Sequence, residues 1–116
     1  MKSQDRRMRP DERQAVALLA HLLLQGGRPA KAMHLLDGLD ALHPDDPTTL
    51  LALAVAQVRS AQAKEALHTL ERLHRLGDAP ALLPLLRAQA LDATGRHEEA
   101  QAAMQIFLHN QGPSTP

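Results

Sequence analysis

Three segments of the chain repeat one pattern at a constant spacing, and this repeat constrains the fold more than any other feature. They begin at residues 27, 61 and 95, so both offsets are 34 residues and no gap is needed. Their sequences are GRPAKAMHLLDGL, AQAKEALHTLERL and GRHEEAQAAMQIF. Each has an alanine (Ala32, Ala66 and Ala100), with large apolar residues four and seven positions later. Such self-similarity indicates stacked units that cannot bury their apolar faces alone.

The register continues backwards into the helix that precedes each of these segments, which is the first helix of its unit. There Leu19 aligns with Leu53, and alanine recurs at Ala20, Ala54 and Ala88. A helix-turn-helix unit of this period, with small residues where helices cross, resembles the tetratricopeptide repeat. The alanines allow the two helices of a unit, and successive units, to approach closely. The chain departs from the family pattern in two respects: Ala61 stands where the other units have glycine, and Phe107 is the only aromatic residue.

Proline and glycine divide the chain into six segments of helical length. Helices are predicted from Pro10 to the Gly26-Gly27 pair, from Pro29 to the HPDDP turn at 43–47, from Pro47 to about Arg59, from Ala63 to Leu76, from residues 81–84 to Thr94, and from Glu98 to Asn110. Asp46 is expected to cap the third helix. Pro84 is expected in the first turn of the fifth, because a proline further inside would cost about 3 kcal/mol.

The sequence therefore predicts one all-α domain at residues 10–110. It would contain three tandem helix-turn-helix units, at about 13–46, 47–80 and 81–112, stacked as a short right-handed array with a concave groove. Residues 1–9 and 111–116 are predicted to be flexible ends. Strand signals are absent, since apolar and polar residues do not alternate and β-branched residues are sparse.

Composition excludes several classes of function. The 13 basic residues balance 13 acidic ones, so no overall field would attract nucleic acid or an anionic membrane. The chain has no cysteine, which excludes a disulfide scaffold and fits a reducing compartment. The apolar run Ala15 to Leu24 is too short to cross a bilayer, and the nearby Asp11 and Glu12 argue against a signal peptide. We expect a cytoplasmic protein with no membrane insertion and no nucleic-acid partner.

The residues that catalysis requires are not arranged for it. The serines are Ser3, Ser60 and Ser114, two of them near the chain ends, and no glycine-rich phosphate loop is present. None of the seven histidines lies three or four residues from another, the spacing at which helical histidines share a metal ion. The sequence predicts neither an enzyme nor a cofactor or metal site.

The first helix of each pair is expected to line the concave face, which is the usual binding surface of such arrays. The groove-lining positions of the family fall on Ala17, His21 and Leu24 in the first unit, Leu51, Val55 and Val58 in the second, and Leu82, Leu85 and Gln89 in the third. A largely apolar set of this kind marks an interaction surface and suits an amphipathic partner helix. The alternative is that the helices are rotated differently and these residues pack inside the array.

Three stretches resemble the small tetratricopeptide chaperones of bacterial type III secretion systems: LLLQGGRPAKA (22–32), LLDGLDALHPDDP (35–47) and LLRAQALDATGRHEEAQAAM (85–104). The likeness is strongest to the YscY family and covers nearly all of residues 11–108. It implies a chaperone that binds a small YscX-like secreted protein, delivers it to the export apparatus and engages the major export-gate protein. The YscG family comes second and implies a chaperone for the C-terminal helix of a needle subunit.

A generic scaffold for protein–protein interaction is the alternative from a different class. Three units without a separate capping helix leave both end faces at risk of exposure. The sequence therefore also allows a homo-oligomer that forms when no other partner is bound.

Overall fold

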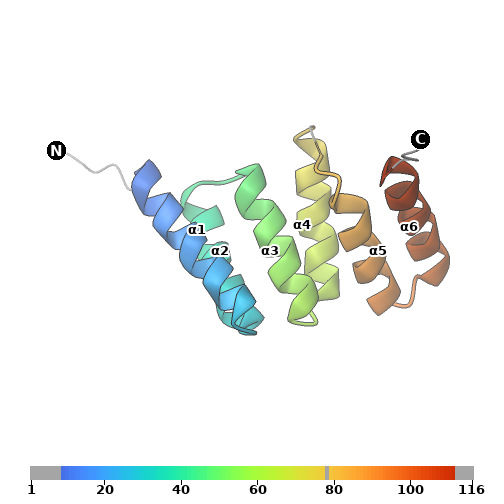
Figure 1. The fold of residues 1–116 in the computed structure, drawn as a ribbon, viewed down its shortest axis with the longest axis horizontal. Helices are drawn as coiled ribbons and strands as arrows, with labels where there is room; N and C mark the ends of the chain where they lie inside the picture. Colours follow the sequence, from blue (N-terminus) through green and yellow to red (C-terminus); the bar gives the residue numbers. More distant parts are fainter. Residues whose placement is uncertain (1–8, 78, 112–116) are drawn as a thin grey trace.

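The computed structural model describes residues 9–77 and 79–111. Within these ranges all helices are α-helices and there is no β-strand. The helices follow one another in chain order along the long axis of the molecule (Figure 1). They are α1 (Pro10–Gln25), α2 (Pro29–Leu42), α3 (Pro47–Arg59), α4 (Ala63–Arg75), α5 (Leu83–Ala93) and α6 (His97–Gln111). The predicted all-α array of three helix pairs is confirmed.

The turn inside each helix pair has the same backbone geometry in all three units. One residue there, Gly27, Ala61 or Gly95, has a left-handed backbone with φ of 75°, 61° or 83°. The next residue donates its N–H to the carbonyl five positions earlier, at 2.8, 2.8 and 2.9 Å (Arg28 to Leu23, Gln62 to Gln57, Arg96 to Leu91). This hydrogen bond defines a Schellman helix end. The 34-residue period is therefore present in the backbone as well as in the side chains.

Prolines lie in the first turn of four of the helices, as the sequence predicts. Pro10, Pro29 and Pro47 are the first residues of α1, α2 and α3, and Pro84 is the second residue of α5. A proline in the first turn removes an N–H group that would have no helical partner, and its fixed φ suits the helix. The predicted late start of α5 is therefore confirmed.

Buried side chains form three clusters along the array, centred on α1 to α3, on α3 to α5, and on α5 with α6. The six alanines at the predicted crossing positions are all buried (Ala20, Ala32, Ala54, Ala66, Ala88 and Ala100). Leu36, Leu53 and Leu70 fill the spaces between them and are fully buried. Each such leucine contributes about 1.5–3 kcal/mol relative to an exposed side chain. Close helix crossings at alanine thus alternate with leucine layers.

The molecule is elongated and curved. Its radius of gyration is 15.7 Å, against about 13 Å for a compact domain of 100 residues. The first helices of the pairs contact one another, α1 with α3 and α3 with α5, whereas within the described ranges no backbone contact joins α2 to α4 or α4 to α6. In a curved array the helices of the inner layer lie closer together than those of the outer layer. Helices α1, α3 and α5 therefore form the inner, concave side, and α2, α4 and α6 the outer side.

Several local predictions need correction. Asp46 is the residue before α3, but its carboxylate accepts a hydrogen bond from the Thr49 hydroxyl at 2.9 Å instead of capping a backbone N–H. The N–H of Arg9 donates to the Glu12 carboxylate at 2.9 Å, so Arg9 belongs to the start of α1 and not to a flexible end. Helix α4 ends one residue earlier than predicted, and α6 extends one residue further at each end. The rest of the predicted flexible ends and Asp78 lie outside the described residues.

Candidate partner-binding site

A cavity of about 440 Å³ opens between the early turns of α1 and α3 on the inner layer. The buried Leu36 and Leu39 of α2 lie at its base. Ala17 and His21 line it from α1, and Ala52 lines it from α3. Its volume is within the range of about 300–1,000 Å³ that is typical of protein ligand pockets. The cavity is large enough to accept apolar side chains from a bound segment.

Polar groups surround this apolar base. Arg13, Gln14, Asp46 and Thr48 also line the cavity. The Nε atom of Arg13 is buried there and has no hydrogen-bond partner in the part of the chain that the structure describes. A buried donor without a partner costs about 1–3 kcal/mol. The cavity thus combines an apolar base with a charged hydrogen-bond donor.

The structure brings two of the predicted groove residues, Ala17 and His21, together in this cavity. In the middle of the array, Leu51 packs against the second core cluster and Val55 against both the first and the second. Both side chains are half-buried, as is Val58 at the end of α3. These three residues therefore support the inner layer from within while keeping part of their surface accessible.

The remaining predicted residues lie in different surroundings. Leu82 precedes α5 and is 39% exposed, and Leu85 in α5 is half-buried. Gln89 lines a second cavity, of about 490 Å³, between α5 and α6. Leu24 is only 8% exposed and belongs to the first core cluster. Leu24 therefore packs inside the array and is not part of the accessible inner face.

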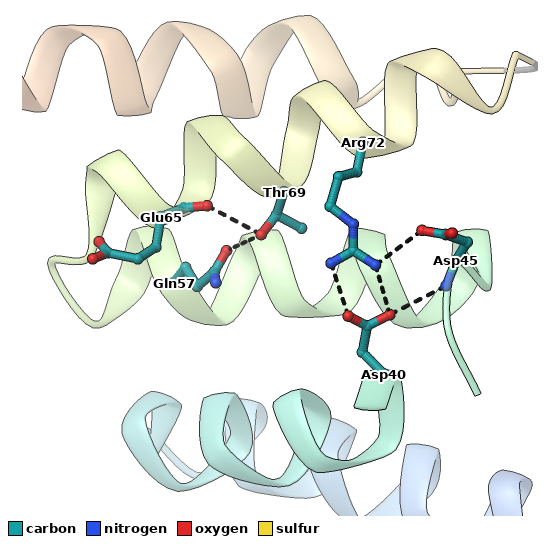
Figure 2. Close-up of polar contacts among 6 residues, drawn as sticks. All are labelled: Asp40, Asp45, Gln57, Glu65, Thr69 and Arg72. Carbon is teal, nitrogen blue, oxygen red and sulfur yellow. Dashed lines mark hydrogen bonds and ion pairs between the residues drawn. The ribbon is translucent and has the colours of Figure 1, made fainter. Parts of the chain in front are cut away.

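Behind the groove, a polar network joins the first two units (Figure 2). The Arg72 guanidinium of α4 donates two hydrogen bonds to the Asp40 carboxylate of α2, at 2.8 and 3.0 Å, and a third to Asp45 at 2.9 Å. The backbone N–H of Asp45 donates to Asp40 at 3.2 Å. Since α2 and α4 share no backbone contact within the described ranges, this network links the two helices directly.

The environment of this network shifts the pKa values of its members. Hydrogen bonds from the Arg72 guanidinium hold the pKa of the Asp40 carboxyl below its usual value, although partial burial opposes the shift. The two carboxylates in turn raise the pKa of Arg72. The side chains of Asp40 and Arg72 are only 14% and 25% exposed. The pair is therefore ionised at neutral pH and better shielded from solvent than an ordinary surface ion pair.

A second buried hydrogen bond joins α3 to α4. The Thr69 hydroxyl donates to the Gln57 side-chain oxygen at 2.7 Å, and it also lies 3.0 Å from the Glu65 carbonyl (Figure 2). Both side chains are buried, so the bond satisfies two polar groups inside the second unit. Neither this bond nor the Arg72 network was predicted from the sequence. The only signal was an unlike-charge pair separated by 32 residues.

Within the described ranges, no group of three His, Cys, Asp or Glu residues is placed to hold a metal ion. No helix of the described part is long and apolar enough to cross a membrane.

An array of helix pairs with a lined inner face defines a helical-repeat protein of the protein-binding type. The tetratricopeptide repeat family model matches residues 23–81, which is half of the chain, and the chain belongs to this family. The solved structure of the type III secretion translocator chaperone SycD from Yersinia enterocolitica (alternative dimer) has the same fold. Its TM-score is 0.78 at 21% sequence identity, over 87% of this chain and 76% of SycD.

A longer relative is similar in sequence. Cellulose synthase operon protein C of Xanthomonas axonopodis pv. citri (strain 306) is 36% identical over 93 residues, which cover 72% of this chain. The match spans only 6% of the length of that protein.

Proposed function

We propose that this chain is a chaperone of the type III secretion class that binds an apolar, amphipathic segment of a small secreted protein on its inner face. The segment lies along α1, α3 and α5 and inserts a side chain into the cavity above Leu36 and Leu39. The chaperone acts in the bacterial cytoplasm, keeps its client soluble and delivers it to the export apparatus. Its mechanism is binding, with no catalytic step.

The cavity between α1 and α3 is the observation that carries this proposal. An amphipathic helix or extended segment gains affinity by placing apolar anchors in such a depression, and the gain is about 25 cal/mol per Å² of apolar surface buried. The guanidinium of Arg13, which lines the cavity, adds charged donors for a carbonyl or carboxylate of the client. The fold shared with SycD, which is a translocator chaperone, supports the class.

The finer identity of the client follows from the sequence resemblance. A YscX-like secreted protein is the proposed client, and the major export-gate protein is the proposed docking partner at the membrane. A needle subunit, held as in the YscG family, is the alternative client. Both clients present a short amphipathic segment, so the same inner face would serve either one.

A cavity-filling variant tests this use of the inner face. Ala17→Leu places a larger side chain in the cavity without adding charge, and we expect at least a tenfold loss of affinity for a co-expressed YscX-like protein. Ala102→Leu makes the same change at an exposed site on α6 and should bind as the unmodified chain does. Co-elution on size-exclusion chromatography, followed by calorimetric titration, measures both. If neither a YscX-like protein nor a needle subunit co-elutes with the unmodified chain, the proposal is wrong.

A general interaction scaffold is the second candidate. The similarity to a short part of the much longer cellulose synthase operon protein favours it, because the same units there belong to a larger polypeptide. Under this alternative, neither the unmodified chain nor the Ala17→Leu variant would bind a secretion protein.

A further inference from the structure

Helix α1 presents an apolar stripe on the face that points away from the array. The stripe consists of Ala15, Leu18, Leu19 and Leu22, whose spacing of three, four and seven residues places them on one side of a helix. The three leucines are 59%, 49% and 54% exposed, and Ala15 is exposed as well. Ala17 and His21, which line the groove cavity, lie on a different face of the same helix.

The repeat explains what this stripe is. The equivalent positions are Thr49, Ala52, Leu53 and Ala56 in α3, and Leu83, Leu86, Arg87 and Ala90 in α5. They lie at the junctions with the preceding units, and all but the half-buried Ala52 and Arg87 are buried. Leu53 and Ala56 are 1% and 0% exposed, and Leu86 and Ala90 are 5% and 0% exposed. The stripe on α1 is therefore a junction face of the array, and within the described ranges no helix covers it.

The side chains of the stripe differ from those at the two internal junctions, so they do not suit a partner helix packed in the same way. Where both internal junctions have alanine, at Ala56 and Ala90, α1 has Leu22, so a second helix could not approach α1 as closely as α2 approaches α3. A partner with large and small residues in the complementary order is required.

We propose that the partner is α1 of a second copy, paired antiparallel about a two-fold axis. The midpoint of the stripe lies between Leu18 and Leu19. Antiparallel pairing therefore places Leu22 of one copy over Ala15 of the other, and Leu18 beside Leu19 of the other. Large side chains then meet small ones at both ends, with leucines in the centre, as in a short helical seam. A two-fold contact of this kind closes after two copies, whereas stacking α1 on α6 would give open chains.

Single cysteines test this geometry cleanly, because the chain has none of its own. Ala15→Cys and Leu22→Cys, mixed in equal amounts and oxidised with oxidised glutathione, should form a disulfide-linked heterodimer several times faster than either variant forms a homodimer. A parallel pairing would instead link each variant to itself. Head-to-tail stacking would link Leu22→Cys to Leu108→Cys on α6. Either of these patterns would overturn the proposal.

Light scattering on the complete chain gives an independent measure. We expect twice the chain mass of 12.6 kDa at micromolar concentration. Leu22→Glu should weaken the dimer by about a hundredfold, because it buries an unpaired charge in the seam. Leu108→Glu changes a leucine that is also 54% exposed, at the far end of the array, and should leave the dimer intact. Circular dichroism confirms that both variants are folded. A monomer at all concentrations, or equal effects of the two variants, would sink the dimer and would leave client binding at the groove unaffected.

Discussion

The two junctions between units both bury apolar side chains but differ in their polar contacts. At the first junction, Arg72 reaches back to Asp40 and Asp45. At the second junction the equivalent positions, 34 residues later, are occupied by Ile106 and His74. Ile106 is 54% exposed, and no ion pair joins α4 to α6 within the described ranges. The first junction is therefore held by apolar burial and ions, and the second by apolar burial alone.

This difference separates two tasks in the molecule. Apolar burial occurs at both junctions, so it builds the array. The ion network occurs only behind the cavity, where it spans the gap between α2 and α4. We infer that it fixes the angle between the first two units and so keeps the α1/α3 cavity open. Variants that remove the apolar and the ionic contributions one at a time separate these two tasks.

Removing one core leucine from each junction should give the largest effects, and unequal ones. Leu70 is completely buried in the second cluster, whereas Leu36 is buried but also lies at the base of the 440 Å³ cavity. Leu→Ala changes in cores cost about 2–5 kcal/mol, and the cost rises with the void that is left. We expect the free-energy cost of Leu70→Ala to lie near the upper end of this range. The cost of Leu36→Ala should lie near the lower end, because part of the space beside Leu36 is already empty. Urea denaturation of both variants measures the difference, and equal costs would argue against the cavity.

The contrast also shows which features a sequence can reveal. The helices, their turns and the buried alanines were predictable because proline, glycine and the 34-residue period act locally. The pair formed by Arg72 and Asp40 was not, because the meeting of side chains 32 residues apart depends on how α2 and α4 are rotated. The same holds for Leu24, which shares its helix with the groove residues but turns into the core. Cavities depend on the angle between helices, which the repeat pattern leaves open.

Breaking the ion network should destabilise the first junction. Arg72→Met keeps much of the apolar stem but leaves the Asp40 carboxylate, only 14% exposed, without its partner. Losing hydrogen bonds to a charged and partly buried group costs about 1.5–3 kcal/mol. Arg75→Met is the matched control on the same helix, since the Arg75 ion pair with Glu71 is more than half exposed and worth less than about 0.5 kcal/mol. If the denaturant midpoints of the two variants coincide, then the Arg72 network contributes no more stability than an exposed ion pair.

Acid should weaken the first junction in particular. Arg72 lowers the pKa of Asp40 in the folded chain relative to the unfolded one, where it is about 4. The pair therefore stabilises the fold fully above about pH 4 to 5, and that contribution is lost as the pH falls through the folded-state value. Thermal unfolding between about pH 6 and pH 3 should show a smaller loss of stability for Arg72→Met than for the unmodified chain. Arg96→Met should change the profile less, because the pair of Arg96 with Glu99 is exposed and screened by solvent. Parallel curves for all three proteins would refute this assignment.

The turn of the middle unit offers a smaller gain. Ala61 has φ of 61° where the other units have glycine, and a left-handed alanine costs about 1–2 kcal/mol. Ala61→Gly removes that strain but adds freedom to the unfolded chain, which costs about 0.5–1 kcal/mol. We expect a net stabilisation of about 0.5 kcal/mol, measured as a rise in melting temperature. The reverse change, Gly95→Ala at the equivalent turn, should lower it.

The smallest effect is expected from transferring the network to the second junction. His74→Asp with Ile106→Arg recreates the positions of Asp40 and Arg72 between α4 and α6. Both sites are exposed, and no residue equivalent to Asp45 is available, since Ala79 occupies that position. The new pair should therefore contribute less than about 1 kcal/mol, as surface ion pairs do. A double-mutant cycle separates this coupling from the effects of the single changes. If the coupling equals the loss caused by Arg72→Met, then the stabilisation by the network at the first junction owes nothing to burial or to Asp45.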